Sequence, residues 1–376
     1  MKDIKEILGE EYKGDSRFVA ECRKLQSIYR AEIGEEIHPY KDRNGHAHHY
    51  GNYISNGEVA KEDCWKNFLT EYAFKYAQRR VVNRQKRETI EADRLFNNLL
   101  SSQPMAFNLF CPLMQMREEL PEAATRAIKA AFPWCPIREV TDIDLEFIPE
   151  NYKDLTGDKS AMDAIIRFVD TDGKRGFIAI ETKYSENLGT NVASRREKAI
   201  ETIKQLECFV PDIEERIKAG KPKLTQIYRN FLLSEAYGAH EGMKSYSVIL
   251  APKKHPTTKN ELASLMNELR EEYWHKICSI TLEEFVATIA AHSPQEYRTI
   301  FERFHDRYLN FEKLAKYERH SHEQKSRSIR HMHKNTGTIE QVYTTCQMYR
   351  FCFATSNPLM IFTNAALMPM GLIPAR

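Results

Sequence analysis

The chain has 376 residues, of which 42% are hydrophobic and 29% charged, and its formal net charge is +2 at pH 7. This length and apolar content support a sizeable core in one large domain or two, and the near-neutral charge excludes nucleic-acid binding through overall charge alone. Eight cysteines without a Cys-x-x-Cys pair, and no charged segment followed by an apolar one at the N-terminus, predict reduced thiols in a cytoplasmic protein.

Residues 1–100 are predicted to form a helical N-terminal region. Apolar side chains recur there at helical spacing: Phe18, Cys22, Leu25 and Tyr29. Residues 59–101 are predicted to be one long helical segment, in which Arg80, Arg84 and Arg87 share a helical face. Such a basic stripe suits contacts with phosphates, although a solvated helix face explains it equally well.

Residues 101–315 are predicted to form the core domain. Residues 105–132 indicate further helix, with Pro121 at a helix start, and residues 140–148 alternate between apolar and polar side chains as a strand does. Residues 161–183 then read as two strands joined by a turn, because a segment rich in Asp and Gly separates two apolar runs.

Three charged side chains of this hairpin are predicted to meet. Glu181 and Lys183 lie two residues apart on the second strand and so share a face, and Asp163 stands near the start of the first strand. Two neighbouring carboxylates repel each other, and a divalent cation relieves that repulsion. The alternative is an exposed hairpin in which Glu181 and Lys183 form an ordinary cross-strand ion pair.

The pattern after the hairpin predicts alternating helices and strands. Helices are expected in residues 192–218, 224–237 and 261–274, and strands in residues 245–251 and 277–280. On the second of these helices, Gln226 shares a face with Arg229 or Asn230, one turn away. The predicted fold class is therefore α/β, with a mixed central β-sheet flanked by helices.

Asp163 followed by Glu181-Thr-Lys183 resembles the signature of the PD-(D/E)XK nuclease superfamily, which has the restriction-endonuclease-like fold. The proline that usually precedes the aspartate is replaced by Met162. More narrowly, the hairpin resembles a bacterial family of putative restriction endonucleases, as do two further segments. These are Ser102-Gln-Pro-Met-Ala-Phe-Asn-Leu-Phe110 and Gln226-Ile-Tyr-Arg-Asn-Phe-Leu-Leu233.

The resemblance implies a Mg²⁺-dependent DNA endonuclease with a role in restriction or defence, in which Mn²⁺ can substitute for Mg²⁺. Asp163, Glu181 and the carbonyl of Thr182 would hold the metal, and Lys183 would orient and help to deprotonate the attacking water. The resemblance also assigns site roles to Gln226 and to a glutamate on a helix before the sheet. Glu91 is the candidate for that glutamate, and Glu88, Glu118 and Glu119 compete with it.

DNA is the expected partner, and no membrane is. The candidate nucleic-acid contacts are Arg80, Arg84, Arg87, Tyr184 and Arg229. Two rival functions stay open: an exonuclease or RNA-directed nuclease with the same site, and a non-catalytic nucleic-acid-binding member of the fold.

Residues 316–376 are predicted to comprise a basic, histidine-rich linker and an apolar tail. The longest apolar stretch, residues 358–373, contains an asparagine and a proline and is too short to span a bilayer. The tail has two open interpretations, which are packing on the core and contacts within a homo-oligomer.

Overall fold

The computed structural model describes residues 4–42, 44–55, 64–84, 88–157, 159–187, 196–317 and 319. The described residues up to 317 belong to one compact unit, and residue 319 begins a second. The predicted basic linker and apolar tail therefore lie almost wholly outside the described residues.

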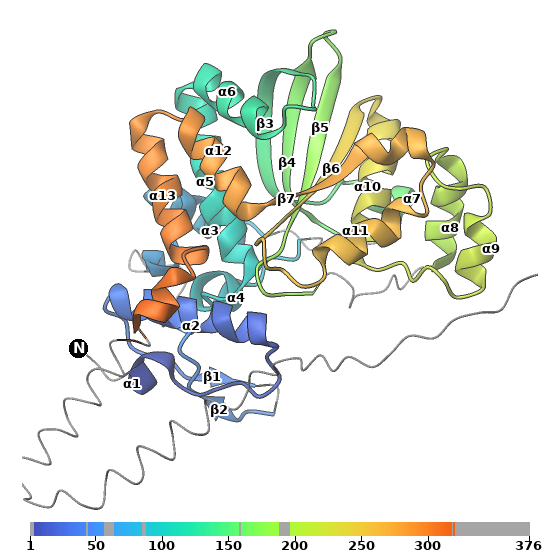
Figure 1. The fold of residues 1–376 in the computed structure, drawn as a ribbon. Helices are drawn as coiled ribbons and strands as arrows, with labels where there is room; N and C mark the ends of the chain where they lie inside the picture. Colours follow the sequence, from blue (N-terminus) through green and yellow to red (C-terminus); the bar gives the residue numbers. More distant parts are fainter. Residues whose placement is uncertain are drawn as a thin grey trace, which may run out of the picture. The chain divides into compact units, whose positions relative to one another are not determined.

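A five-stranded mixed sheet forms the centre of the molecule (Figure 1). In spatial order its strands are β3 (Ile137–Phe147), β4 (Met162–Asp170), β5 (Arg175–Thr182), β6 (Lys244–Ala251) and β7 (Ile277–Thr281). The first three strands pair antiparallel, whereas β5, β6 and β7 pair parallel. The predicted hairpin and the predicted mixed sheet are thus confirmed.

The turn between β4 and β5 is held by its own polar groups. Asp170 Oδ1 accepts hydrogen bonds from the backbone N–H groups of Asp172 and Lys174, at 2.9 and 2.8 Å. Gly173 has a φ of +80°, a conformation that glycine adopts without the strain of a Cβ. This local chemistry fixes the register of the hairpin, and with it the position of every side chain on β5.

One face of the sheet is covered by α5 (Ser102–Glu119), α6 (Pro121–Ala131) and α12 (Leu282–His292), and α13 (Gln295–Tyr308) packs on α12 and α5 (Figure 1). Their apolar side chains join those of the strands in the largest hydrophobic cluster. The first turn of α12 is capped by Thr281, whose side chain accepts a hydrogen bond from the N–H of Glu284 at 3.1 Å.

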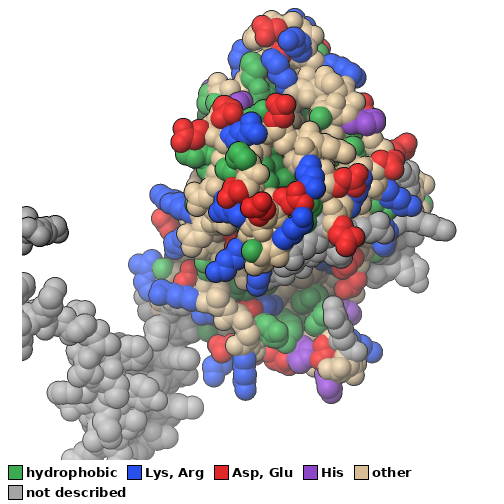
Figure 2. All heavy atoms as spheres, turned by 90° about the vertical axis from the view of Figure 1, so that its right-hand side faces the viewer, with side chains coloured by type: hydrophobic (Ala, Val, Ile, Leu, Met, Phe, Trp, Pro, Cys, Tyr) green, Lys and Arg blue, Asp and Glu red, His purple; other side chains and the backbone are tan. Residues whose placement is uncertain are grey.

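The opposite face is covered by α10 (Gln226–Glu241), which packs on β5 and β6 (Figure 1). The other elements on this side are α7 (Tyr152–Leu155), α8 (Arg196–Gln205), α9 (Ile213–Lys218), α11 (Thr258–Met266) and the 3₁₀ helix η2 (Glu271–Lys276). Basic and acidic side chains of the described residues are interspersed over this side of the molecule (Figure 2), and these residues form no large basic surface there.

The N-terminal region packs into the same unit as the sheet. Its elements are α1 (Ile4–Leu8), α2 (Arg17–Glu32), β1 (Tyr40–Lys41), β2 (Ala47–His48), the 3₁₀ helix η1 (Cys64–Asn67), α3 (Glu71–Val82) and α4 (Ala92–Asn97). The predicted amphipathic helix is confirmed as α2, which buries Phe18, Cys22 and Leu25.

The prediction of one long helix over residues 59–101 is wrong. The backbone N–H of Leu69 donates to the Asn108 side chain at 2.7 Å instead of to a helical carbonyl, and Thr70 caps a new helix, α3. α3 ends at Val82, and a non-helical segment precedes α4. Helical propensity is a weak signal that such tertiary hydrogen bonds override.

A buried arginine connects the N-terminal region to the sheet-covering helices. Arg307 on α13 is 1% exposed and donates to Gln26 Oε1 at 3.3 Å and to the carbonyl of Asn67 at 2.8 Å. Its guanidinium also lies over the rings of Tyr29 and Tyr308, at 4.2 and 4.5 Å. Gln26 in turn donates to the hydroxyl of Tyr184, the residue after Lys183, at 2.9 Å.

Replacing Arg307 by Ala is expected to destabilise the protein by about 3 kcal/mol or more, because it leaves two buried acceptors, Gln26 Oε1 and Asn67 Oδ1, without this donor. The free energy of unfolding from urea titration measures this cost. Arg303, which is exposed on the same helix, is the matched control, and its replacement by Ala should cost less than about 0.5 kcal/mol. Equal stability of the two variants would contradict a structural role for the buried arginine.

Candidate active site

Two carboxylates meet at one edge of the sheet. Asp163 stands near the start of β4 and Glu181 near the end of β5, and the pairing of Ala164 with Ile180 sets them opposite each other. Opposed side chains on antiparallel strands share a face. The backbone N–H and Oγ1 of Thr182 both donate to Asp163 Oδ2, at 2.7 and 2.8 Å, so the position of this carboxylate is fixed by β5.

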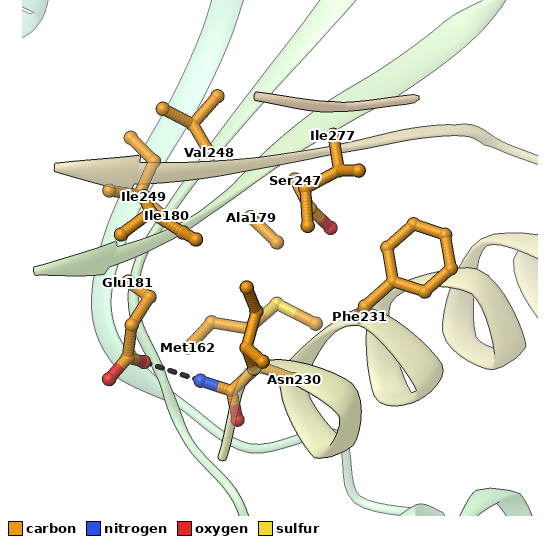
Figure 3. A pocket seen from close by; sticks show the side chains of 11 residues that line it. Met162, Ala179, Ile180, Glu181, Asn230, Phe231, Ser247, Val248, Ile249 and Ile277 are labelled. Carbon is orange, nitrogen blue, oxygen red and sulfur yellow. Dashed lines mark hydrogen bonds between the residues drawn. The ribbon is translucent and has the colours of Figure 1, made fainter. Parts of the chain in front are cut away.

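Glu181 lies at the centre of a buried polar cluster. Lys183 Nζ lies 2.5 Å from Glu181 Oε1, and the two side chains are 8% and 6% exposed. Gln226, the first residue of α10, donates to Glu181 Oε1 at 2.6 Å and accepts from Lys183 Nζ at 3.1 Å. Asn230, one turn further along α10, donates to Glu181 Oε2 (Figure 3). The helix thus holds the acid and the lysine in one arrangement.

A small cavity adjoins this cluster between β5, β6 and α10 (Figure 3). Its volume is about 20 Å³, and its walls are mostly apolar side chains such as Met162, Phe231 and Ile249. This space is enough for about one water molecule and not for a substrate. The cavity is therefore not a substrate site, and of the two acids Asp163 is the more exposed, being half-buried.

Glu146 on β3 supplies a third carboxylate. The register of β3 and β4 sets it opposite Asp163, so three acids lie in a row across three strands. Gln103 Nε2 donates to Glu146 Oε1 at 2.8 Å, and Thr89 Oγ1 donates to Oε2 at 3.0 Å. Its φ of +50° is the only positive value at a non-glycine residue in the described part of the chain. Strained conformations of this kind cluster at functional sites.

The crowding of these acids shifts their proton affinities. Burial, followed by repulsion from Asp163, raises the pKa of Glu181 to about 8 and that of Glu146 to about 7. Burial also raises the pKa of Asp163, although Lys183 and Thr182 oppose the shift. Burial acts to lower the pKa of Lys183, but the Glu181 and Asp163 carboxylates outweigh it and raise that pKa, which keeps the ammonium charged.

A fourth acid, Glu186, lies against the start of α5. Its Oε1 accepts from the backbone N–H and the Oγ of Ser102, at 2.9 and 3.0 Å. Arg94 Nη2 donates to the same oxygen at 3.0 Å, while Arg94 Nε donates to Ser101 Oγ at 2.6 Å. Burial opposes ionisation, but Arg94 and Lys183 outweigh it and lower the pKa of Glu186.

Residues 13–310 match the family model of the PD-(D/E)XK nuclease superfamily. The chain belongs to this superfamily. Neither the curated proteins nor the solved structures include one that matches the chain significantly. Superfamily membership and the mixed sheet confirm the predicted fold class. Members of the superfamily are generally nucleases, which places this chain among the phosphodiester hydrolases, and they typically use divalent metal ions.

The residues at the sheet edge fit a divalent cation of the hard, oxygen-preferring kind. Asp163 and Glu181 offer carboxylate oxygens. Burial raises the pKa of both groups, repulsion from Asp163 raises that of Glu181 further, and a bound cation would relieve this repulsion. In the described residues, no three His, Cys, Asp or Glu side chains are arranged to hold one ion together. One or two carboxylates with water and a backbone carbonyl match the way Mg²⁺ binds.

The structure does not bring Glu91 into this superfamily site. Its side chain is exposed at the start of α4, and its backbone N–H donates to Gln103 Oε1 at 3.3 Å. The nitrogen of the same side-chain amide donates to Glu146. The third acid beside the nuclease pair therefore comes from the strand before the hairpin and not from a preceding helix.

The predicted basic stripe does not form one helical face. Arg80 lies on α3 and is largely buried, where it donates to the carbonyl of Leu145 at 2.6 Å and pairs with Glu88 and Asp144, both at 3.1 Å. Arg84 is exposed beyond the end of the helix, and Arg87 lies outside the described residues. Arg80 consequently supports β3 and has little surface to offer a phosphate.

Two further residues that were predicted to contact nucleic acid differ in how deeply they are buried. Tyr184 is fully buried, with its hydroxyl bonded to Gln26 and its ring edge-to-face with that of Tyr308. It packs the core behind Lys183 and is not available to a substrate. Arg229 is half-buried on α10, between Gln226 and Asn230 in sequence.

Three residues of the site were not predicted from the sequence: Glu146, Arg94 and Glu186. Asn230 was predicted to share a helical face with Gln226 but not to take part in the site. One of the three carried a usable signal. Glu146 alternates with apolar Leu145 and Phe147, so it belongs to the polar set of β3. Arg94 and Glu186 meet only through tertiary packing, which no local pattern indicates.

The raised pKa values predict that the metal-free protein loses stability as the pH rises. A carboxyl whose pKa is raised on folding binds its proton more tightly in the folded chain, so stability falls between the ordinary value of 4.5 and the folded value of about 8 for Glu181. Thermal unfolding from pH 5 to pH 8 in EDTA measures this. Glu181→Gln should flatten the profile, and Mg²⁺ should stabilise the wild type most at high pH. A wild-type profile as flat as that of the variant would contradict the assignment.

Proposed function

We propose that this chain is a Mg²⁺-dependent DNA endonuclease, with Mn²⁺ as a substitute, and that it acts in the cytoplasm in restriction or defence. The observation that carries the proposal is the meeting of Asp163, Glu181 and Lys183 at one sheet edge in a chain of the PD-(D/E)XK superfamily. The acid–acid–lysine arrangement is intact, which favours a catalytic member over a purely binding one.

In this proposal Asp163 and Glu181 hold the metal together with the carbonyl of Thr182. The bound cation supplies charge to stabilise the phosphodiester transition state and to lower the pKa of water. Thr182 fixes Asp163 through two hydrogen bonds, and Gln226 and Asn230 fix Glu181. These four contacts keep the two carboxylates at their positions at the edge of the sheet, so little reorganisation is needed when substrate binds.

Lys183 has the charge and position to act on the reacting phosphate. Its ammonium is held by Glu181 and Gln226, and the acids around it keep it protonated in the metal-free protein. A protonated lysine stabilises negative charge that develops on the phosphate oxygens. With a cation bound, the acid charges that keep Lys183 protonated would be offset, and the amine would then be able to take a proton from water.

A substrate panel tests this function. Supercoiled plasmid, linear duplex, single-stranded DNA and RNA are incubated with the protein in Mg²⁺, Mn²⁺ or EDTA. The proposal expects nicking or linearisation of the closed plasmid with either metal and no cleavage in EDTA. Cleavage of RNA alone would indicate an RNA-directed nuclease instead. Degradation from linear ends without attack on the closed circle would indicate an exonuclease.

A further inference from the structure

We propose that Arg94 binds a backbone phosphate of the substrate next to the reacting one, with Glu186 and Ser101 as the residues that position its guanidinium. This inference rests on the proposed nuclease function and deepens it. It assigns the substrate contact to α4, in place of the predicted stripe on α3.

The first observation is the way in which Arg94 is held. Ser101 Oγ accepts from its Nε at 2.6 Å, and Glu186 Oε1 accepts from its Nη2 at 3.0 Å. These two bonds use two of the five N–H donors of the guanidinium. The side chain nevertheless stays 40% exposed, so the planar group is oriented by its partners and still open to solvent. A fixed guanidinium that faces solvent is suited to a phosphate.

The second observation is that this cluster is tied to the catalytic strand. Glu186 follows Lys183 by three residues, and its carboxylate is also held by the backbone N–H and Oγ of Ser102 at the start of α5. The charges of Lys183 and Arg94 both act to lower the pKa of Asp163. Through Glu186, Arg94 is held beside the segment that follows the catalytic strand.

The third observation is the balance of charge at the sheet edge. Four carboxyl groups surround the site, those of Glu146, Asp163, Glu181 and Glu186, and the two cations Lys183 and Arg94 lie among them. The ionised acids repel an approaching phosphate, which therefore needs a cation to meet it. Lys183 is only 8% exposed and is engaged by Glu181 and Gln226. Arg94 is the more accessible of the two cations, so it contacts the nucleic-acid strand first.

The rival explanation is that Arg94 and Glu186 form an ion pair that only stabilises the fold. The two explanations differ in the salt dependence of DNA binding. Each phosphate contact adds about 0.9 to the slope of log K against log salt, whereas a purely structural arginine adds nothing. Ca²⁺ in place of Mg²⁺ allows binding to be measured on uncut duplex.

The experiment measures the affinity of a fluorescent DNA duplex in Ca²⁺ between about 50 and 200 mM salt. Arg94→Gln should weaken binding at every sequence and lower the slope by about 0.9, and Arg94→Lys should retain most of the slope. Arg117 is half-exposed in the last turn of α5, and its Nη1 donates to the carbonyl of Thr141 at 3.2 Å. Arg117→Gln is the matched control and should leave the slope unchanged.

An Arg94→Gln variant that unfolds cooperatively and keeps the wild-type slope would overturn the inference. If that variant loses its cooperative unfolding, Arg94→Met keeps the aliphatic length of the side chain and takes its place under the same criterion. Failure of the proposed function itself is distinguishable, because the wild-type protein would then cut no nucleic acid in Mg²⁺. A wild type that cuts DNA while Arg94→Gln keeps the slope removes only the role of Arg94.

Discussion

Replacing Asp163 by Asn is expected to lower the rate of DNA cleavage by about 10³-fold or more. The variant loses one of the two carboxylates that hold the cation, and metal charge is worth several kcal/mol in the transition state, where about 1.4 kcal/mol is a factor of ten. The amide oxygen of Asn can still accept from Thr182, so the fold should persist. Because repulsion among the three acids falls, the melting temperature in EDTA should rise.

The control for this variant lies on the same hairpin. Asp172 is exposed in the turn at the opposite end of β4 and β5, and Asp172→Asn should cut DNA at the wild-type rate. Cleavage is followed on a labelled duplex, and stability is followed by thermal unfolding. Metal-dependent cleavage by Asp163→Asn at the rate of the control would remove Asp163 from the metal site.

Replacing Lys183 by Ala is expected to slow cleavage by about 10²–10⁴-fold while most of the metal affinity remains. The two acids still hold the cation, but the ammonium beside Glu181 is lost. Lys183→Arg separates the two roles of the lysine. Arginine keeps the charge but is effectively never deprotonated, so it should restore part of the rate if the side chain acts as a charge and none if it acts as a base.

Lys174 provides the comparison for the lysine variants, because it is exposed in the hairpin turn. Lys174→Ala should match the wild type in cleavage and in Mn²⁺ affinity. Binding of Mn²⁺, measured by calorimetry, checks that any loss of rate in Lys183→Ala is not a loss of metal. Normal cleavage by Lys183→Ala would reduce the lysine to an ion-pair partner of Glu181.

The fold was predictable where local patterns and tertiary packing agree. The hairpin of β4 and β5 joins two apolar strands through a turn rich in Asp and Gly, and the structure has both strands within two residues of their predicted ends. The N-terminal region was less predictable. Its long helical pattern is interrupted because Asn108, on a distant helix, accepts the N–H of Leu69. No pattern within the sequence of either segment indicates such a contact.

The candidate site was likewise predictable only where a local pattern indicates it. Asp163, Glu181 and Lys183 were found from the alternation of side chains along two neighbouring strands, a local property of the chain. Gln226 lies on a helix that packs against these strands, and its place followed from the family resemblance. The sequence did not indicate that Arg80 is buried. Its charge is paired with Asp144 and Glu88 inside the protein and is not presented to a ligand.

The most direct test of the central claim is the initial rate at which supercoiled plasmid is nicked by the wild type and by Glu181→Gln, each in Mg²⁺ and in EDTA. Glutamine keeps the size of the side chain and can still accept from Lys183, so the variant differs mainly in charge. We predict nicking only by the wild type and only in Mg²⁺. Equal nicking by both proteins in Mg²⁺, or nicking by the wild type in EDTA, would contradict a metal-dependent site at Asp163, Glu181 and Lys183.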